Sequence, residues 1–307
     1  MNDSHLKSSL LEFIRRTSCE MPKDISDAIF AATKREVEGS RGRYAMDIVC
    51  ENIKLAAKRS QPICQDTGSI LFFVRTPVGF NQIEFEDAAR KAVAEATEKG
   101  FLRQNSVDSI TGKNSGNNLG PGSPCFHFEQ ISPSPTPSPT LPHQGGGKMM
   151  VKLLLKGGGC ENCGAQYSLP DKKLDAQRNL DGVRKCVLDC VLQAQGKGCG
   201  PAILGVCFGG DRVTGYIHSK EQLLRPLTDT NPIPELAKME KEIMEISNKL
   251  GIGPMGFGGA TTLLGCKIIA QNRIPASFFV SISYMCWADR RQGVELDNDG
   301  KIVRWIY

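Results

Sequence analysis

The stretch Pro62–Arg75, PICQDTGSILFFVR, decides the fold because it joins a helix to a strand through a polar loop. Pro62 ends the preceding helix, since proline lacks the amide hydrogen that helix propagation needs. The run Ser69–Arg75 is short and apolar, which predicts a buried strand. The loop between them places Cys64 at the end of an element, where other loops can approach it.

The residues before this stretch form three apolar stripes at helical spacing, which predict three helices within about the first 60 residues. The residues that mark the stripes are Leu10, Leu11, Phe13 and Ile14, then Ile25, Ile29 and Phe30, then Tyr44, Ile48, Ile53 and Leu55. After the strand, Asn81 and Glu84 have the spacing of a helix N-cap, and they predict a helix that ends at about Lys99.

Strands and helices continue to alternate toward the C-terminus. The predicted strands are 125–130, 149–155, 202–208, 263–270 and 277–284, and the predicted helices are 180–195, 211–224 and 234–250. This alternation predicts an α/β fold. We expect a mixed sheet flanked by helices, an N-terminal helical segment, and catalytic loops at the strand ends.

We expect one domain over residues 1–307, interrupted by a low-complexity insertion at 132–148. The insertion, SPSPTPSPTLPHQGGGK, is rich in proline and then glycine, which favours an exposed mobile loop over a packed element. It is either a tolerated insertion at the tip of a hairpin or a polyproline ligand for a partner domain. We favour the tolerated insertion.

Composition excludes several classes of protein. The chain has 38 basic and 33 acidic residues, a small and interspersed excess that does not indicate nucleic-acid binding. The longest apolar run, Ala276–Ala288, falls short of the ~20 residues that cross a bilayer. The first residues lack the charged-then-apolar pattern of a secretion signal. We therefore expect a cytoplasmic protein with no nucleic-acid or membrane partner.

Twelve cysteines and only four histidines direct attention to thiol chemistry. In a reducing compartment a disulfide framework is not expected, which leaves metal or cluster ligation, catalysis, or plain buried thiols. Cys64, Cys199 and Cys286 all lie where an element ends. Three thiolates from distant loops suit a [4Fe–4S] cluster with one open iron, although buried thiols are the commoner explanation for scattered cysteines.

The motifs around these cysteines favour the cluster. In order, the motifs are PICQDTG, LRQN, TGKN, KGGG, GIGPMGFGGATT and CWADRR. Together they resemble the alpha subunit of the two-subunit iron–sulfur hydro-lyases, the group of class I fumarate hydratase and L(+)-tartrate dehydratase. The resemblance extends from about Arg15 to Arg291. PICQDTG and GIGPMGFGGATT are specific motifs, whereas KGGG alone is weak.

The resemblance implies a role for seven residues. It makes Cys64, Cys199 and Cys286 the ligands of a [4Fe–4S] cluster. It makes Gln65, Arg103 and Gly159 substrate-binding, with the Arg103 guanidinium suited to a carboxylate, and it makes Asp66 a candidate catalytic acid. From the residues alone, Asp66 is better explained as part of a turn, and Arg103 is open to the explanation of a solvated surface residue.

The resemblance also implies the reaction and the partners. The family adds water reversibly to a C=C bond flanked by carboxylates, with the open iron as Lewis acid toward the hydroxyl. Fumarate/malate is the first expected substrate pair, and L-tartrate to oxaloacetate is the next. In the family the base and further carboxylate-binding groups lie on a beta subunit. We therefore expect a small dicarboxylate substrate, a separate beta subunit, and a heterotetramer or larger assembly.

Three departures keep an alternative open. Ile274 stands where the family commonly has a histidine near the substrate, and isoleucine can neither titrate nor donate a hydrogen bond. The second ligand motif reads Cys-Gly-Pro where Cys-Pro-Pro is commoner. Cys160 and Cys163 form a CxxC pair that suggests zinc or redox chemistry, for which Cys186 and Cys190 are further candidate ligands.

The alternative is therefore a non-catalytic metal- or redox-binding homologue. Arg290 and Arg291 are also ambiguous at this stage, because they suit either the lining of the cluster site or a charged surface.

Overall fold

The computed structural model describes residues 3–131 and 149–307, so the insertion predicted at 132–148 lies outside the described residues. The chain forms two compact units. Unit 1 comprises Met1–Pro22, Leu55–Lys156 and Arg290–Tyr307, and unit 2 comprises Lys23–Lys54 and Gly157–Asp289. The single domain expected over residues 1–307 stays a prediction.

The three helices expected at the N-terminus are confirmed. They are α1 (Asp3–Cys19), α2 (Lys23–Arg35) and α3 (Arg41–Arg59). In α1 the apolar stripe is fully buried, with Leu10, Phe13 and Ile14 at 0% exposure. Burial of such a stripe, more than intrinsic propensity, stabilises helices of this length.

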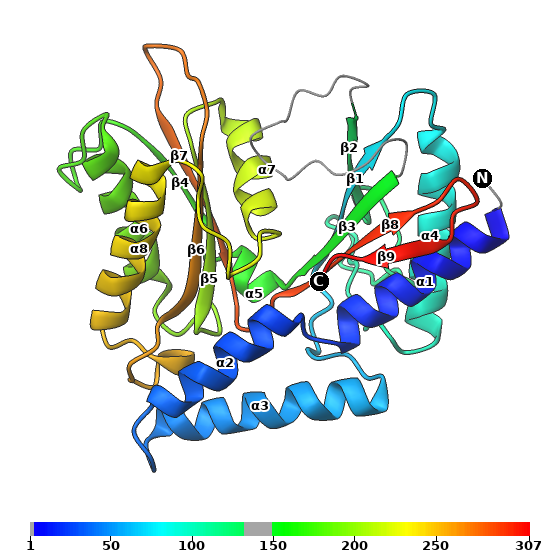
Figure 1. Ribbon diagram of the computed structural model, residues 1–307, viewed down its shortest axis with the longest axis horizontal. Coiled ribbons are helices and arrows are strands. Elements are labelled where there is room, and N and C mark those ends of the chain that lie inside the picture. The colour runs from blue at the N-terminus through cyan, green and yellow to red at the C-terminus, as the bar shows by residue number, and fades with distance from the viewer. Residues whose placement is uncertain (1–2, 132–148) are drawn as a thin grey trace. The chain divides into compact units, whose positions relative to one another are not determined.

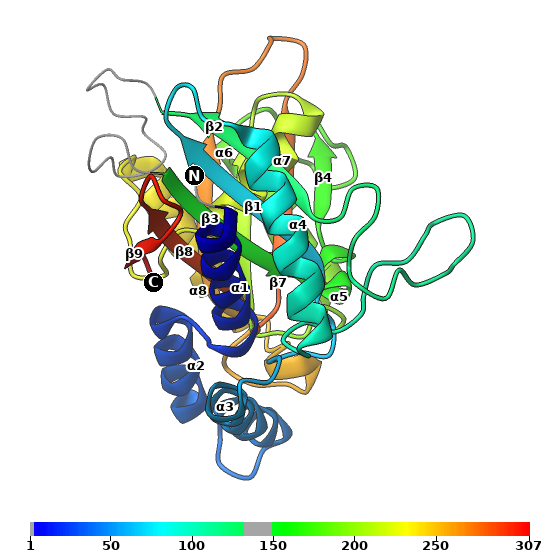
Figure 2. The ribbon, with the colours of Figure 1, turned by 90° about the vertical axis from the view of Figure 1, so that its right-hand side faces the viewer.

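Unit 1 is built on a five-stranded mixed sheet. Its order is β2-β1-β3-β8-β9, from β1 (Ser69–Thr76), β2 (Cys125–Gln130), β3 (Met149–Lys156), β8 (Arg290–Leu296) and β9 (Ile302–Trp305). The β1–β2 pair is parallel and the other pairs are antiparallel. Helices α1 and α4 (Gln82–Glu98) pack together on one face (Figure 2), where Phe72, Phe85 and Leu153 belong to the core.

Unit 2 has a four-stranded sheet with helices on both faces. The order is β4-β7-β5-β6, from β4 (Ala165–Ser168), β5 (Ala202–Phe208), β6 (Leu263–Ala270) and β7 (Phe279–Met285). Helices α6 (Leu180–Ala194) and α8 (Pro234–Lys249) lie on one face, and α7 (Arg212–Gln222) lies on the other (Figure 1). Gly205 lets α7 approach closely, because an added Cβ would lie 2.0 Å from the Ser219 carbonyl oxygen.

The expected α/β class is confirmed, as is the N-cap at Asn81, whose side chain accepts from the amides of Ile83 and Glu84. Strands β4, β8 and β9, helix α5 (Gly158–Glu161) and the short 3-10 turn η1 (Pro254–Gly256) were not expected. Strand β8 contains Arg290 and Arg291, both at 0% exposure. The interpretation of these two arginines as surface charge is therefore wrong.

None of the helices in the described ranges combines the length and the apolar character that crossing a bilayer requires.

Unit 2 contains a buried cluster of charged side chains that includes Lys267 of β6. The Lys267 ammonium, with a side chain 5% exposed, donates to Asp229 Oδ1 at 2.5 Å and to the Leu227 carbonyl at 3.1 Å. Arg225 donates to both Asp229 oxygens at 2.9 and 3.0 Å and to Glu240 at 3.1 Å. Burial alone would raise the pKa of Asp229, but the hydrogen bonds from the two cations outweigh it and lower this pKa.

Asp229→Asn tests this network. A lowered carboxyl pKa adds stability above the unfolded pKa of about 4, and this stability disappears as the pH falls through the folded value. We expect the variant to lose about 2 kcal/mol of unfolding free energy at pH 7, and this deficit should shrink in urea titrations below pH 4. The control Asp27→Asn removes only an exposed partner of Lys23 and should cost under about 0.5 kcal/mol. A deficit that does not change with pH would contradict the network's role.

Candidate functional site

The loop Cys64–Gly68 of unit 1 leads directly into β1. The amide of Ile63 donates to the Ser18 carbonyl at 3.0 Å, which ties the start of this loop to the end of α1. The amide of Asp66 points to the Cys64 Sγ at 3.4 Å, and Cys64 is only half-buried. The loop thus holds a half-buried thiol whose sulfur faces a backbone donor.

Arg103 lies beside this loop. The Thr67 hydroxyl donates to the Arg103 carbonyl at 2.7 Å and accepts from the Arg103 amide at 2.8 Å. Asn105 Nδ2 donates to Asp66 Oδ1 at 2.8 Å. The Arg103 side chain is exposed, so the backbone is fixed while the guanidinium stays available to a ligand. Unit 1 therefore brings together Cys64, Gln65, Asp66 and Arg103.

Asn118 completes this arrangement, and sequence reasoning missed it. Its side chain is 1% exposed, its Oδ1 accepts from the Asn105 amide at 2.7 Å, and its Nδ2 donates to the Arg103 carbonyl at 2.9 Å. The Gly/Asn-rich stretch that contains Asn118 gave only the signal of a loop. An asparagine that satisfies buried backbone groups thirteen to fifteen residues away has no local pattern that would reveal it.

Cys199 and Cys286, the other two expected ligands, lie together in unit 2. The amide of Trp287 donates to the Cys199 carbonyl at 3.2 Å, which joins the two loops at the same end of β5 and β7. Cys199 is exposed and has φ +52°. This left-handed conformation is uncommon for a residue other than glycine, and such residues concentrate at functional sites. Cys286 is 8% exposed.

The Gly-rich segment after α8 supports the Cys199 loop. Gly196 and Gly256 approach so closely that a Cβ on Gly256 would lie 2.7 Å from the Gly196 Cα. The amide of Met255 donates to the Gly200 carbonyl at 3.0 Å. Glu36 fixes the far side of the segment, where its carboxylate accepts from the amides of Ala260 and Thr261 at 3.0 and 2.9 Å. The segment GIGPMGFGGATT thus supports the loop that contains Cys199.

Tyr284 packs directly under the same loop. Its ring touches Gly198, where a Cβ would lie 2.2 Å from the Tyr284 Cε1. Burial raises the pKa of Tyr284, and the nearby thiols of Cys163, Cys286, Cys190 and Cys160 raise it further. The phenol therefore stays protonated in a region rich in sulfur.

Gly159 also lies in this part of unit 2. It is exposed at the start of α5, and the nearest atom to an added Cβ is the Lys197 carbonyl oxygen at 3.9 Å. The following thiol, Cys160, donates to the Gly157 carbonyl at 3.1 Å and contacts the Met285 Sδ at 3.8 Å. Unit 2 therefore places Gly159 near the segment that leads to Cys199, and Cys160 beside the residue that precedes Cys286.

The zinc alternative finds no support. Cys160, Cys163, Cys186 and Cys190 all belong to unit 2. Across residues 3–131 and 149–307, no three histidine, cysteine, aspartate or glutamate side chains form a group that could hold a metal ion. The three expected cluster ligands differ from the zinc set because they are divided between the units, with Cys64 in unit 1 and the other two in unit 2.

Other thiols are poor candidates for ligation. Burial raises the pKa of Cys19 to about 11 and the pKa values of Cys186 and Cys207 to about 12, and it raises the pKa of Cys266 as well. Metal ligation needs the thiolate. Exposed Cys199 and half-buried Cys64 contrast with these buried thiols, whereas Cys286 is itself buried.

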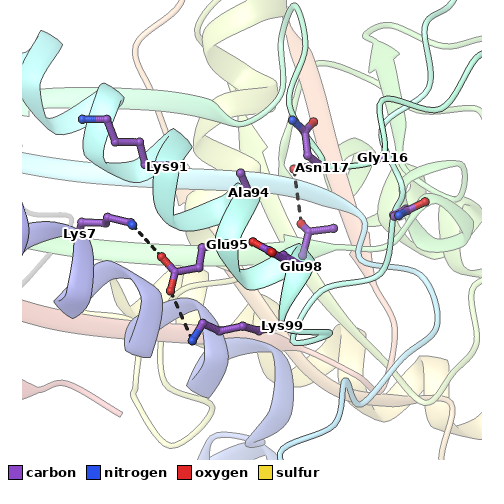
Figure 3. Close-up of a pocket in the computed structure, with 10 residues that line it drawn as sticks. Lys7, Lys91, Ala94, Glu95, Glu98, Lys99, Gly116 and Asn117 are labelled. Carbon is purple, nitrogen blue, oxygen red and sulfur yellow. Dashed lines mark hydrogen bonds and ion pairs between the residues drawn. The ribbon is translucent and has the colours of Figure 1, made fainter.

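An open pocket of about 930 Å³ on unit 1 contains none of the expected site residues. Helix α4 and the loop near Asn117 line it, together with Lys7 from α1 (Figure 3). Its central charge, Glu95, pairs with Lys7 at 2.7 Å and with Lys99 at 3.4 Å, and the hydrogen bond from Lys7 lowers the pKa of Glu95. These charges satisfy one another at the surface, so we do not assign the pocket a catalytic role.

Ile274, expected from the sequence to stand where the family commonly has a histidine, is 67% exposed in the connection between β6 and β7. Cys286 follows the opposite end of β7. A seven-residue strand spans roughly 20 Å, so within unit 2 Ile274 is remote from the loops of Cys199 and Cys286.

Comparison with known proteins gives a consistent family. The model of the family "Fumarate hydratase (Fumerase)" matches residues 7–295. The chain is 51% identical over 306 residues to "Putative fumarate hydratase class I" of Geobacillus stearothermophilus, covering 98% of this chain and 57% of that relative. The chain thus spans little more than half the length of this relative.

Two further relatives are alpha subunits. The chain is 30% identical over 296 residues to "Putative L(+)-tartrate dehydratase subunit alpha" of Methanocaldococcus jannaschii, covering 95% of this chain and 98% of that relative. It is 30% identical over 295 residues to the L(+)-tartrate dehydratase subunit alpha of Escherichia coli strain UTI89, covering 96% of this chain and 91% of that relative.

Gly198→Ala tests the packing that supports Cys199. The new methyl group collides with the Tyr284 ring, so we expect a loss of about 1–3 kcal/mol in unfolding free energy. The control is Gly120→Ala, where the nearest atom to the new Cβ is the Ser106 Oγ at 3.6 Å. Thermal unfolding of both variants provides the measurement, and equal stability of the two would show that the Gly198–Tyr284 contact is unimportant.

Proposed function

The chain belongs to the fumarate hydratase (fumerase) family, and from this membership we propose that it is the alpha-type part of a [4Fe–4S]-dependent hydro-lyase acting on a small dicarboxylic acid. The observation that carries the proposal is the pairing of the Cys199 and Cys286 loops through the Trp287 amide. Fumarate/malate is the first substrate pair, in line with the 51% identity to a class I relative. L-tartrate is the second, in line with the alpha-subunit relatives.

Cys64, Cys199 and Cys286 are the proposed cluster ligands. The donor set fits a cluster, because each thiol lies on a loop at a strand end and Cys199 is exposed on strained backbone. When bound, such a cluster supplies a Lewis-acidic iron that carries no thiolate. The buried thiols with raised pKa values take no part in this set.

The residues of unit 1 would bind and orient the substrate. Arg103, with its backbone held by Thr67 and Asn118, offers a guanidinium fork to one substrate carboxylate. Gln65 is exposed on the adjacent loop and offers amide donors and an acceptor. Asp66, oriented by the hydrogen bond from Asn105, is the proposed acid toward the substrate hydroxyl. In unit 2, Gly159 offers backbone without a side chain in the way.

We further propose a separate beta subunit as partner and a heterotetramer or larger assembly. Two tartrate dehydratase alpha subunits align over nearly their whole length, whereas only 57% of the class I relative is covered. The beta chain would supply the base that removes the carbon-bound proton. A reducing cytoplasm suits a chain with twelve cysteines, and this location is part of the proposal.

The non-catalytic alternative rested on Ile274 and on the CxxC pair. Ile274 is exposed and remote from Cys199 and Cys286 within unit 2. The described residues form no zinc group around Cys160 and Cys163. The position of Ile274 favours the hydro-lyase.

Cys64→Ser tests the ligand set. After anaerobic reconstitution, we expect wild type to hold the iron and sulfide of a full cluster with visible absorbance, and the variant to lose most of both. A serine hydroxyl is a far poorer ligand than a thiolate for an iron–sulfur cluster. The matched control is Cys163→Ser, a half-buried cysteine outside the proposed set, which should keep the cluster. The reverse pattern would overturn the assignment.

The reaction is tested with and without a candidate beta chain, by following fumarate through its ultraviolet absorbance under anaerobic conditions. We expect fumarate consumption only when both chains are present. A full cluster in the alpha chain, with no turnover of fumarate, malate or tartrate by the pair, would favour the non-catalytic homologue.

A further inference from the structure

Arg290 is the most unusual charged residue in the described chain. It is 0% exposed, and its Nε, Nη1 and Nη2 atoms are all buried without a hydrogen-bond partner among the described residues. Arginine keeps its charge in proteins, and a buried charge without compensation is strongly destabilising. Buried Arg225 shows the ordinary solution, since it donates to Asp229, Glu240 and a backbone carbonyl. Arg290 therefore needs a partner that residues 3–131 and 149–307 do not provide.

The sheet of unit 1 places Arg290 near the Cys64 loop. Ile70, Leu155 and Arg290 form one row across β1, β3 and β8. Since neighbouring strands lie about 4.8 Å apart, the Cα atoms of Ile70 and Arg290 are about 10 Å apart. Strands β1 and β8 both run antiparallel to β3 and are therefore parallel to each other. The start of β8, at Arg290, lies at the end of the sheet where the Cys64–Gly68 loop enters β1.

The chain also links Arg290 closely to a second expected ligand. Only three residues separate it from Cys286. A four-residue step spans at most about 14 Å when fully extended. The short stretch of chain between them therefore keeps Arg290 close to Cys286. The register of the sheet places Arg290 at the end where the Cys64 loop enters β1.

Burial indicates the kind of anion. A substrate that enters and leaves must reach its binding group from solvent, as it can reach exposed Arg103. All three guanidinium nitrogens of Arg290 are inaccessible. A group that is assembled with the protein and stays there can occupy such a position. The thiolate and sulfide sulfurs of an iron–sulfur cluster are anionic hydrogen-bond acceptors.

We propose that Arg290 is the buried counter-charge of the iron–sulfur cluster, donating hydrogen bonds to its anionic sulfur atoms from the end of the sheet beside the Cys64 loop. This inference rests on the proposed function. Arg290 acts as a positioning and tuning residue, because hydrogen bonds to sulfur and local net charge set the reduction potential of such clusters. Removing a nearby positive charge disfavours the added electron, so the potential should become more negative.

A structural role is the competing explanation. Leu6 contacts Gly300, which follows β8, so the opposite end of α1 lies toward the start of that strand. Carbonyls at a helix C-terminus attract a cation. In this case Arg290 would stabilise the protein whether or not a cluster is bound, whereas the proposal predicts a benefit only with the cluster.

Arg290→Met separates the two explanations in the full chain. In anaerobic redox titrations of the reconstituted protein, we expect the ratio of reduced to oxidised cluster at a given potential to fall about tenfold, or about 59 mV for one electron. In urea unfolding of the cluster-free protein, we expect Arg290→Met to be at least as stable as wild type. Arg290→Lys, which keeps the charge, should recover part of the wild-type potential.

The matched control is Arg75→Met. Arg75 belongs to the same sheet but lies at the far end of β1, where it pairs with Glu129 at 2.7 Å. The Arg75→Met variant also removes one positive charge, but it should leave the reduction potential of the cluster unchanged. An unshifted potential in Arg290→Met, or a cluster-free variant that is less stable than wild type or fails to fold, would overturn the inference. A wild-type chain without iron and sulfide would overturn the proposed function itself, and the inference with it.

Discussion

The order of unit 2 near Cys199 depends on the hydrogen bonds that the buried Glu36 carboxylate accepts from the Gly-rich segment. Glu36 is 4% exposed, and it accepts from two consecutive amides of the Gly-rich segment. That segment has so little side chain that it cannot pack itself into one conformation, and glycine loses much backbone freedom when it is ordered. A charged acceptor fixes it, and the fixed segment in turn contacts Gly196 and the Gly200 carbonyl. The conformation of Cys199 is therefore maintained by Glu36, a residue that directly follows α2 and lies far earlier in the chain.

The elements with a clear hydrophobic period could be predicted from the sequence. Helix α4 has an N-cap and a continuous apolar face, and β1 has an uninterrupted apolar run. Strand β8 could not be predicted, because its sequence RRQGVEL is polar although every residue in it is buried. Rules based on hydrophobicity assume that charge stays outside. They fail where buried charge has another purpose, as we infer for Arg290.

The candidate site divides in the same way. Its motifs could be recognised in the sequence, and the structure brings Cys64, Asp66 and Arg103 together in unit 1 and Cys199 and Cys286 together in unit 2. The residues that fix the backbone around these motifs could not be recognised in the sequence. Thr67, Asn118 and Glu36 act through hydrogen bonds to backbone groups far along the chain. Such partnerships leave no spacing rule in a single sequence, because any polar residue of the right length at a distant position can make them.

The supporting contacts explain why the loops of this site are rich in glycine and are nevertheless held in one conformation. Catalytic groups must be held close to their productive geometry, and sites fail when the supporting residues are loose. Gly198 removes a side chain so that the Tyr284 ring can support the loop from below, and Gly256 removes one so that two loops can touch. Glycine in these loops thus permits close packing, and the packing restricts the motion that glycine alone would allow. The strained backbone of Cys199 follows from this packing, since a residue with φ +52° persists only when its surroundings fix it.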